Sequence, residues 1–319
     1  MRKVLLSAVV AIISLTALGQ QDPQFTNWMF DKLSFNPAAA GMRDNCGEHC
    51  ISMFFRDQWD GFDRDPKTLL FNYSGQYGKN LGLGFSYIGD RLGQEQNSII
   101  RFSGAYHHQM GDNFLSGGLS LGYLGKKLGT DWIYIDDNDP LINPLEDSQK
   151  NDGTMDLSFG GMFYQPSKFY VGLSATHLTG GELSDLNIKT AQHFYLMGGY
   201  THEINPTMAL RGNLLAKSDF NATAFDVNAN LLYDNMLYGG ISFRPGDAIA
   251  PMVGVEYDLG CNKKKTSEYC HCIRGGYSYD ITLSDIADYS AGSHEFFVTY
   301  CFTMRTIKII PIHGNPRNL

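Results

Sequence analysis

Apolar and polar residues alternate with a period of two through most of the chain after about residue 50. The clearest runs lie at 81–87, 225–231, 253–259 and 296–302, and in one of them Phe225, Val227 and Ala229 alternate with Asp226 and Asn228. This period is typical of β-strands that bury one face. Soluble β-sandwiches and membrane barrels both show it, so the connections between strands must separate these two fold classes.

Short turns and longer connections follow one another along the chain. Tight turns are expected at 78–79, 111–112, 166–167, 205–206 and 234–235, with longer connections at 57–65, 90–97, 129–152, 179–186 and 284–292. Two connections on the second side, at 218–221 and 245–247, are short. Outer-membrane barrels have tight periplasmic turns and longer external loops. The pattern predicts an all-β protein, a transmembrane antiparallel β-barrel of about 14 strands over residues 46–304, with both ends periplasmic.

The same alternation assigns ten charged residues to the lumen of such a barrel. Both signs occur, so these residues could line a water channel or could pair with each other and with an inserted segment. We favour a salt-bridged network for most of them. The residues are Arg101, Asp156, Arg211, Lys217, Asp226, Arg244, Glu256, Arg274, Asp280 and Glu295.

The first 19 residues have the pattern of a secretory signal peptide. Arg2 and Lys3 precede an apolar stretch at 4–18, and small residues follow at 17–19. This stretch is shorter than the roughly 20 residues of a membrane-spanning helix. The pattern therefore predicts export.

Residues 20–45 are predicted to form a plug-like segment. Phe25, Trp28, Met29 and Leu33 recur at helical spacing, which predicts a short amphipathic helix. Asn36-Pro37 would end this helix, and the small residues at 38–41 could pass through a narrow space. In a barrel, the segment would lie at the periplasmic mouth or inside the lumen.

Composition supports a barrel and offers no catalytic chemistry. The 319 residues include 35 Gly, 18 Tyr and 20 Phe, only 18% are charged, and the mean hydropathy is -0.23. The formal net charge of -8 argues against nucleic acid as a partner. The nine His are scattered, with His107-His108 the one adjacent pair, and no nucleophile elbow, zinc-protease helix or phosphate loop occurs. We expect no enzyme activity and no cofactor.

The connection at 129–152 combines acidic and apolar residues. Its carboxylates could bind Ca²⁺, although their spacing does not match an EF-hand loop. Its apolar residues could form a docking surface for a partner protein or fold back over the barrel mouth. These predicted partner-binding residues are Trp132, Ile133, Tyr134, Ile135, Leu141 and Ile142.

Six cysteines are predicted to lie at the periplasmic rim, near the seam between the first and last strands. An exported protein favours disulfides, and six thiols allow 15 pairings. The nearest pairs in this arrangement are Cys46 with Cys50, Cys261 with Cys270, and Cys272 with Cys301. A zinc site that uses His49 or His271 is the less favoured alternative.

Two motifs at opposite ends of the chain carry a family resemblance. The first is QDPQF at 21–25 with Met29-Phe30 and NPAAAG at 36–41; the second is GGYSYDITLSDIADYSAGSHEFFVTY at 275–300. Together they resemble the PorP/SprF family, outer-membrane proteins of the type IX secretion and gliding machinery of Bacteroidetes-type bacteria. The chain departs from the family by continuing at 305–319, which would be a periplasmic contact arm or a disordered end.

The resemblance implies a non-enzymatic barrel in the outer membrane of a Gram-negative bacterium. Such a protein would bind a secreted, adhesin-like surface protein, the secretion apparatus, or both, in secretion, gliding motility or cell adhesion. The alternative is an outer-membrane porin or hydrophobic-substrate transport channel. The N-terminal segment discriminates between these functions, because a segment that fills the lumen blocks diffusion.

Overall fold

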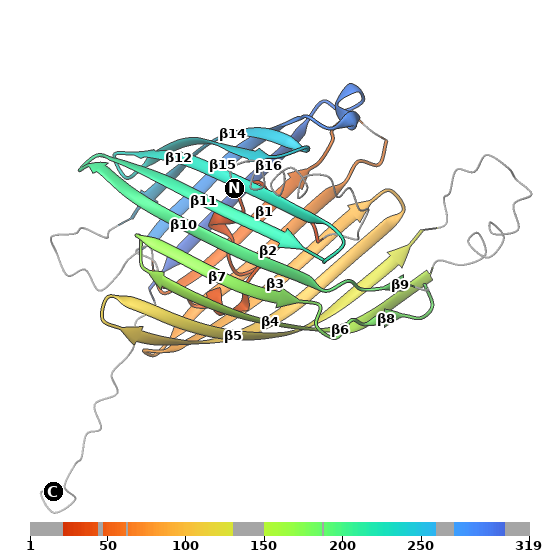
Figure 1. Ribbon diagram of the computed structural model, residues 1–319, viewed down its shortest axis with the longest axis horizontal. Coiled ribbons are helices and arrows are strands. Elements are labelled where there is room, and N and C mark those ends of the chain that lie inside the picture. Colours follow the sequence, from red (N-terminus) through yellow and green to blue (C-terminus); the bar gives the residue numbers. More distant parts are fainter. Residues whose placement is uncertain are drawn as a thin grey trace, which may run out of the picture.

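Fourteen antiparallel strands close into a barrel in the computed structural model, which describes residues 22–43, 47–61, 63–129, 150–186, 188–259 and 271–303 (Figure 1). Strands that are consecutive in the sequence pair with each other around the barrel. A separate two-stranded hairpin, β8 and β9, interrupts the connection between β7 and β10. The predicted all-β barrel and its strand number are confirmed.

The strands differ in length, and three of them are much longer than a bilayer requires. About 9–11 tilted residues cross a membrane, whereas β4, β5 and β6 each have 16. The elements are η1 Trp28–Phe30, η2 Pro37–Ala39, β1 His49–Asp57, β2 Lys67–Tyr77, β3 Leu81–Leu92, β4 Glu95–Met110, β5 Asn113–Leu128, β6 Lys150–Gln165, β7 Phe169–Thr176, β8 Glu182–Leu183, β9 Ile188–Lys189, β10 His193–Asn205, β11 Met208–Ser218, β12 Thr223–Tyr233, β13 Leu237–Arg244, β14 Ala248–Asp258, β15 His271–Thr282, η3 Asp285–Asp288 and β16 Ser293–Phe302.

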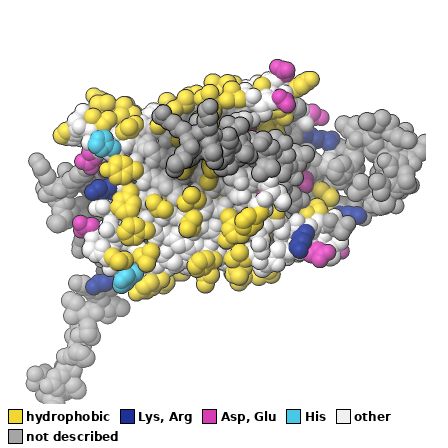
Figure 2. Space-filling view, in the orientation of Figure 1, with side chains coloured by type: hydrophobic (Ala, Val, Ile, Leu, Met, Phe, Trp, Pro, Cys, Tyr) yellow, Lys and Arg dark blue, Asp and Glu magenta, His cyan; other side chains and the backbone are white. Residues whose placement is uncertain are grey.

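Alternation along each strand separates an apolar outer face from an inner face that carries both polar and apolar residues. In β5, residues are exposed and buried in turn, and Leu119 and Leu121 on the outer face are 57% and 55% exposed. Hydrophobic side chains cover much of the barrel wall, and charged side chains lie toward its two ends (Figure 2). A lipid-facing apolar band around the barrel follows from this pattern. Among the described residues, no helix is long and apolar enough to cross a membrane.

The two ends of the barrel are distinct. One end, called the short-turn end below, carries the predicted tight turns, each of two or three residues between paired strands. The other, the long-loop end, carries the connections after β1, β5, β7 and β15. The longer connection predicted at 90–97 is wrong, because Leu92 pairs with Glu95 and only residues 93–94 join β3 to β4. The connection predicted at 129–152 is slightly shorter than expected, because Lys150 already pairs with Leu128 at the start of β6. β1 starts and β16 ends at the short-turn end, which faces the periplasm in outer-membrane barrels.

Candidate functional site

The lumen is occupied by residues 22–43, here called the luminal segment. It starts at the long-loop end, where Asp22 contacts His177 beyond the end of β7, and reaches the short-turn end, where Arg43 donates to the Lys79 carbonyl. The segment thus runs the length of the barrel before it joins β1, and is not restricted to the periplasmic mouth. Figure 1 shows this stretch inside the strands.

The predicted amphipathic helix does not form. The segment contains only two short 3₁₀ turns, η1 and η2. Its backbone groups bond to the barrel wall instead of to a helix: Glu295 accepts hydrogen bonds from the Thr26 and Asn27 amides, both at 2.7 Å. The predicted break at Asn36-Pro37 is correct in position, but here Pro37 begins η2 and the Asn36 side chain caps it.

A buried network of charges holds the part of the segment nearest the long-loop end, called its upper part below. We call this network the outer anchor. Its members are Thr26, Asn27, Arg56, Arg244, Asp280 and Glu295. Arg56 lies 2.7 Å from Asp280 and 3.2 Å from Glu295, and these three side chains are at most 1% exposed. The Thr26 hydroxyl donates to Asp280 at 2.8 Å and accepts from Arg56 and Arg244. Two residues of the segment thereby bond to charged groups from four strands of the wall, and Arg244 also pairs with Asp226 and Asp247.

A second charged cluster fixes Asp22 near the long-loop end. The Asp22 carboxylate lies 2.9 Å from His177 Nε2 and accepts from the Tyr195 hydroxyl at 2.8 Å, while His177 Nδ1 lies 3.1 Å from Asp156. Burial alone would lower the pKa of His177, but the Asp22 charge and the hydrogen bond with Asp156 raise it to about 9. Burial likewise opposes ionisation of Asp22, yet His177 holds its pKa well below the ordinary value of 3.8.

The same cluster contains the one group of potential metal ligands found among the described residues. Ligand atoms of Asp22, His177 and His193 all lie within 4.8 Å of one another. The Arg101 guanidinium, however, lies 3.3 Å from His177 Nε2. A cation at this nitrogen would be repelled by Arg101 and would have to displace a proton that two carboxylates stabilise. The cluster therefore suits an ion pair better than a metal ion.

Apolar side chains of the segment fill the middle of the lumen. Trp28 is fully buried, and Phe25 and Met29 are almost so. Phe30 stacks on Phe297 with ring centroids 4.8 Å apart, and Phe25 packs edge-on against Phe54. The plug residues predicted from the sequence, Phe25, Trp28, Met29, Leu33, Asn36 and Pro37, are all buried in the lumen.

Glycines in the wall make room for the lower half of the segment. A methyl group at Gly118 would lie 2.5 Å from the Ala38 nitrogen, and one at Gly82 would overlap the Ala40 carbonyl. Wall side chains then bond the chain where it passes these glycines: Ser116 donates to the Ala38 carbonyl at 2.7 Å, and His107 lies 2.7 Å from the Ala40 carbonyl. The small residues expected to pass through a narrow space do so.

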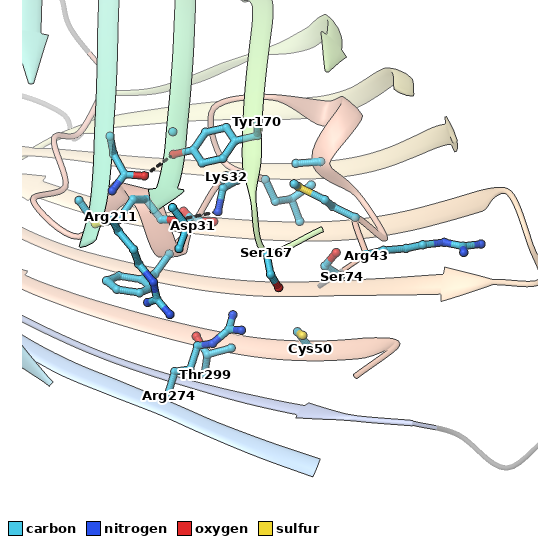
Figure 3. Close-up of a pocket in the computed structure, with 18 of the residues that line it drawn as sticks. Asp31, Lys32, Arg43, Cys50, Ser74, Ser167, Tyr170, Arg211, Arg274 and Thr299 are labelled. Atoms are coloured by element: carbon cyan, nitrogen blue, oxygen red, sulfur yellow. Dashed lines mark hydrogen bonds between the residues drawn. The ribbon is translucent and has the colours of Figure 1, made fainter. Parts of the chain in front are cut away.

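Beside the segment, toward the short-turn end, lies a cavity of about 240 Å³ that we call the vestibule (Figure 3). Met29, Asp31 and Lys32 of the luminal segment line its inner part, and the exposed turn residues Ser167 and Lys168 lie at its mouth. It is therefore a blind pocket that opens toward the periplasmic side of the barrel.

The disulfide pairing proposed from the sequence is wrong at Cys50 and Cys301. These two residues are bonded to each other, with Cα atoms 4.1 Å apart, and not to Cys46 and Cys272. Cys301 lies opposite Cys50 on one side and Cys272 on the other, since β16 sits between β1 and β15. Strand pairing alone therefore allows Cys301 to bond to either Cys50 or Cys272. The observed bond crosses the seam that closes the barrel, and Cys272 is also disulfide-bonded.

The other predicted residues divide into confirmed, missed and undescribed groups. The ten lumen charges face inward, as the alternation predicts. Arg56, at the centre of the outer anchor, was missed, although it shares the inward face of β1 with Ser52 and Phe54. The predicted docking residues Trp132–Ile135 and Leu141-Ile142, the candidate carboxylates for Ca²⁺ at 131–147, and Cys46, Cys261 and Cys270 lie outside the described residues. Asp152, the last carboxylate of that set, is described and accepts from the Gly153 and Asp185 amides.

Comparisons with known proteins agree with this architecture. No curated protein matches the sequence. The toluene transporter TodX of Pseudomonas putida is 10% identical, with 84% of this chain and 92% of that chain covered and a TM-score of 0.50. A FadL homologue from Pseudomonas aeruginosa is 10% identical, with 91% and 96% covered and a TM-score of 0.49. At such low identity, likeness shows the barrel fold alone.

The sequence itself gives the family. The pattern of the type IX secretion system membrane protein PorP/SprF matches residues 17–300, which includes the luminal segment and nearly all of the barrel. The chain therefore belongs to the PorP/SprF family of type IX secretion system membrane proteins.

Proposed function

We propose that this chain is a non-enzymatic component or accessory of the type IX secretion machinery that acts by holding other proteins. Its outer loops bind a secreted, adhesin-like surface protein, and its periplasmic end contacts the secretion apparatus. The chain is an outer-membrane protein by family and fold, so both surfaces are available from one molecule. A role in gliding motility or adhesion would follow from the identity of the bound surface protein.

The observation that carries this proposal is the filled lumen. The luminal segment is bonded to the wall at its upper end by the outer anchor and at its lower end through Ser116 and His107. A channel for diffusing solutes needs a free path, and this segment removes the free path along its length. Binding at the two ends of the barrel is then the function that remains, and it requires no catalytic residues.

The external docking surface can be tested with matched loop variants. In one variant, Trp132–Ile135, Leu141 and Ile142 are changed to Ser; in the control, the acidic residues at 131–147 are changed to amides and the apolar residues are kept. Apolar area left in water costs about 25 cal/mol per Å², so a partner that covers it gains affinity. We expect the first variant to release a secreted protein into the medium and the control to retain it on cells.

The periplasmic contact is tested by deleting residues 306–319 and comparing co-purified proteins in detergent extracts of the envelope. We expect loss of periplasmic machinery while the secreted partner is retained. If the loop variant and the tail deletion both keep every co-purifying protein, the proposed binding roles are wrong.

The channel alternative is tested by conductance in planar bilayers. The intact protein should show no large, steady pore, and deletion of residues 21–33 should open one while the barrel stays folded. A steady pore in the intact protein would favour a porin or a hydrophobic-substrate channel.

A further inference from the structure

None of the outer-anchor residues lines the vestibule. The net charge of the vestibule lining also differs in sign from that of the whole protein. Five cationic side chains line it, namely Lys32, Arg43, Lys168, Arg211 and Arg274. Two carboxylates, Asp31 and Glu256, lie among them. Positive charge in the vestibule thus exceeds negative charge by three, in a chain whose formal net charge is -8.

The cations come from the wall, a turn and the luminal segment. In Figure 3, Lys32, Arg211 and Arg274 lie on one side of the vestibule, whereas the Arg43 side chain extends away from them and donates to the Lys79 carbonyl. Arg211 makes a two-point contact with Glu256, and Arg274 lies 3.9 Å from the same carboxylate. One carboxylate thereby faces two guanidinium groups, whose planar donors suit a second carboxylate. Lys32 lies 4.6 Å above the Tyr170 ring, which keeps its ammonium beside the cavity.

Apolar surface accompanies the charge. Met29, Phe30 and Met42 line the vestibule from the luminal segment, and Phe169 and Tyr200 line it from the wall. The cavity has a volume of about 240 Å³. This room suits the end of a peptide, with a carboxylate and one apolar side chain, and excludes a folded domain.

We propose that the vestibule binds an acidic peptide end that enters from the periplasmic side. Arg211 and Arg274 bind its carboxylates, Arg43 and Lys168 add positive charge nearer the periplasmic side, and the aromatic and methionine side chains cover an apolar residue. A cationic pocket with low-dielectric walls concentrates anions, which favours this occupant over neutral or basic peptides. The inference depends on the proposed function in one respect: the peptide is taken to arrive from the periplasmic side, where the secretion apparatus is proposed to dock.

The test uses the full-length protein in detergent and fluorescence anisotropy. The probe is a fluorescein-labelled Gly-Ser-Gly-Ser-Glu-Asp-Phe peptide with a free carboxyl end; the matched peptide has Gln-Asn in place of Glu-Asp and an amidated end. We expect saturable binding of the acidic peptide, weakened by salt, and at least tenfold weaker binding of the neutral one.

Variants then assign the binding to the vestibule. Arg43→Gln and Lys168→Gln should each weaken binding about two- to fivefold, as expected for partly exposed ion pairs. Thr201→Trp, which fills the cavity from β10, should abolish it. Lys79→Gln is the control, because this lysine lies in the turn between β2 and β3 at the same end of the barrel and does not line the cavity.

Three results would overturn the proposal. The first is equal affinity for the two peptides. The second is unchanged affinity in all three variants, Arg43→Gln, Lys168→Gln and Thr201→Trp. The third is full displacement of the peptide by inorganic phosphate at the peptide's own concentration, which would show a small-anion site. Failure of peptide binding with normal co-purification of the machinery would refute the vestibule site and leave the proposed function intact.

Discussion

Glu295→Gln is the most direct test of the outer anchor, because this side chain touches both the luminal segment and the wall. Glu295 is fully buried, and each of its carboxylate oxygens accepts two hydrogen bonds. One oxygen accepts from the amide and side chain of Asn27; the other accepts from the Thr26 amide and from Arg56. The glutamine amide group has nearly the same shape but only one accepting oxygen, so the substitution tests charge and acceptor number rather than size.

The expected cost follows from these contacts. The new NH₂ group faces two donors and cannot accept from either, so at least two hydrogen bonds to a charged group are lost. At about 1.5–3 kcal/mol each, this loss amounts to about 3–6 kcal/mol, which overlaps the cost of about 3–5 kcal/mol for removing one partner of a buried ion pair. A change of this size releases the upper end of the segment in a large fraction of molecules, while the strand ladders of the wall are unchanged.

Trp28 reports this release, because it is fully buried beside the anchor. In a protein with Trp59 and Trp132 changed to Phe, Trp28 is the remaining tryptophan of three. We expect its emission to shift to longer wavelength in Glu295→Gln, and limited proteolysis to cut near Thr26. Heat-modifiable migration on mild gels should persist, since the closed barrel is intact.

Asp57→Asn is the matched control, because it removes a carboxylate from the same end of the barrel. Its partner Lys67 is 48% exposed and lies 2.8 Å away, so we expect less than about 1 kcal/mol of destabilisation and no shift in Trp28 emission. A Glu295→Gln protein with unchanged Trp28 emission and protease resistance would refute the role assigned to the anchor.

Three further predictions concern other parts of the lumen and the seam. Gly118→Ala should loosen the lower half of the luminal segment by about 1–3 kcal/mol, whereas Gly117→Ala, which meets open space, should not; proteolysis of the segment compares them. Changing Cys50 and Cys301 to Ser should destabilise the barrel by about 2–5 kcal/mol, seen as loss of heat-modifiable migration at lower temperature, and reductant should have no further effect at this bond. Because the pKa of His177 is raised to about 9, its stabilising pair with Asp22 is complete below the unfolded pKa of about 6.5 and is lost as pH rises through about 9. Thermal unfolding at pH 6, 8 and 10 should show this loss in the native protein and not in His177→Gln; equal pH profiles would contradict it.

The sequence by itself determined the barrel, because the relevant physics is local. A period of two assigns each residue to one face, and the alternation of turn and loop lengths assigns each connection to one end. That is why the inward direction of residues such as Asp280 and Glu295 could be predicted without knowing what they contact. The luminal position of Trp28 could also be predicted, since large apolar residues followed by a run of small ones suit a narrow interior.

Only the tertiary structure decided which of these residues meet. The outer anchor joins Thr26 to Arg56, Arg244 and Asp280, and the last two lie more than 200 positions away in the sequence. The segment's conformation was decided in the same way: its helical spacing was overruled because Glu295 and other wall groups bond its backbone directly. Cys301 is the clearest case, since two neighbours flank it in the closed sheet and only the closure of the barrel brings Cys50 within bonding distance. Periodicity fixes the direction in which a side chain points, whereas partners depend on closure, register and the path of a segment that no local pattern encodes.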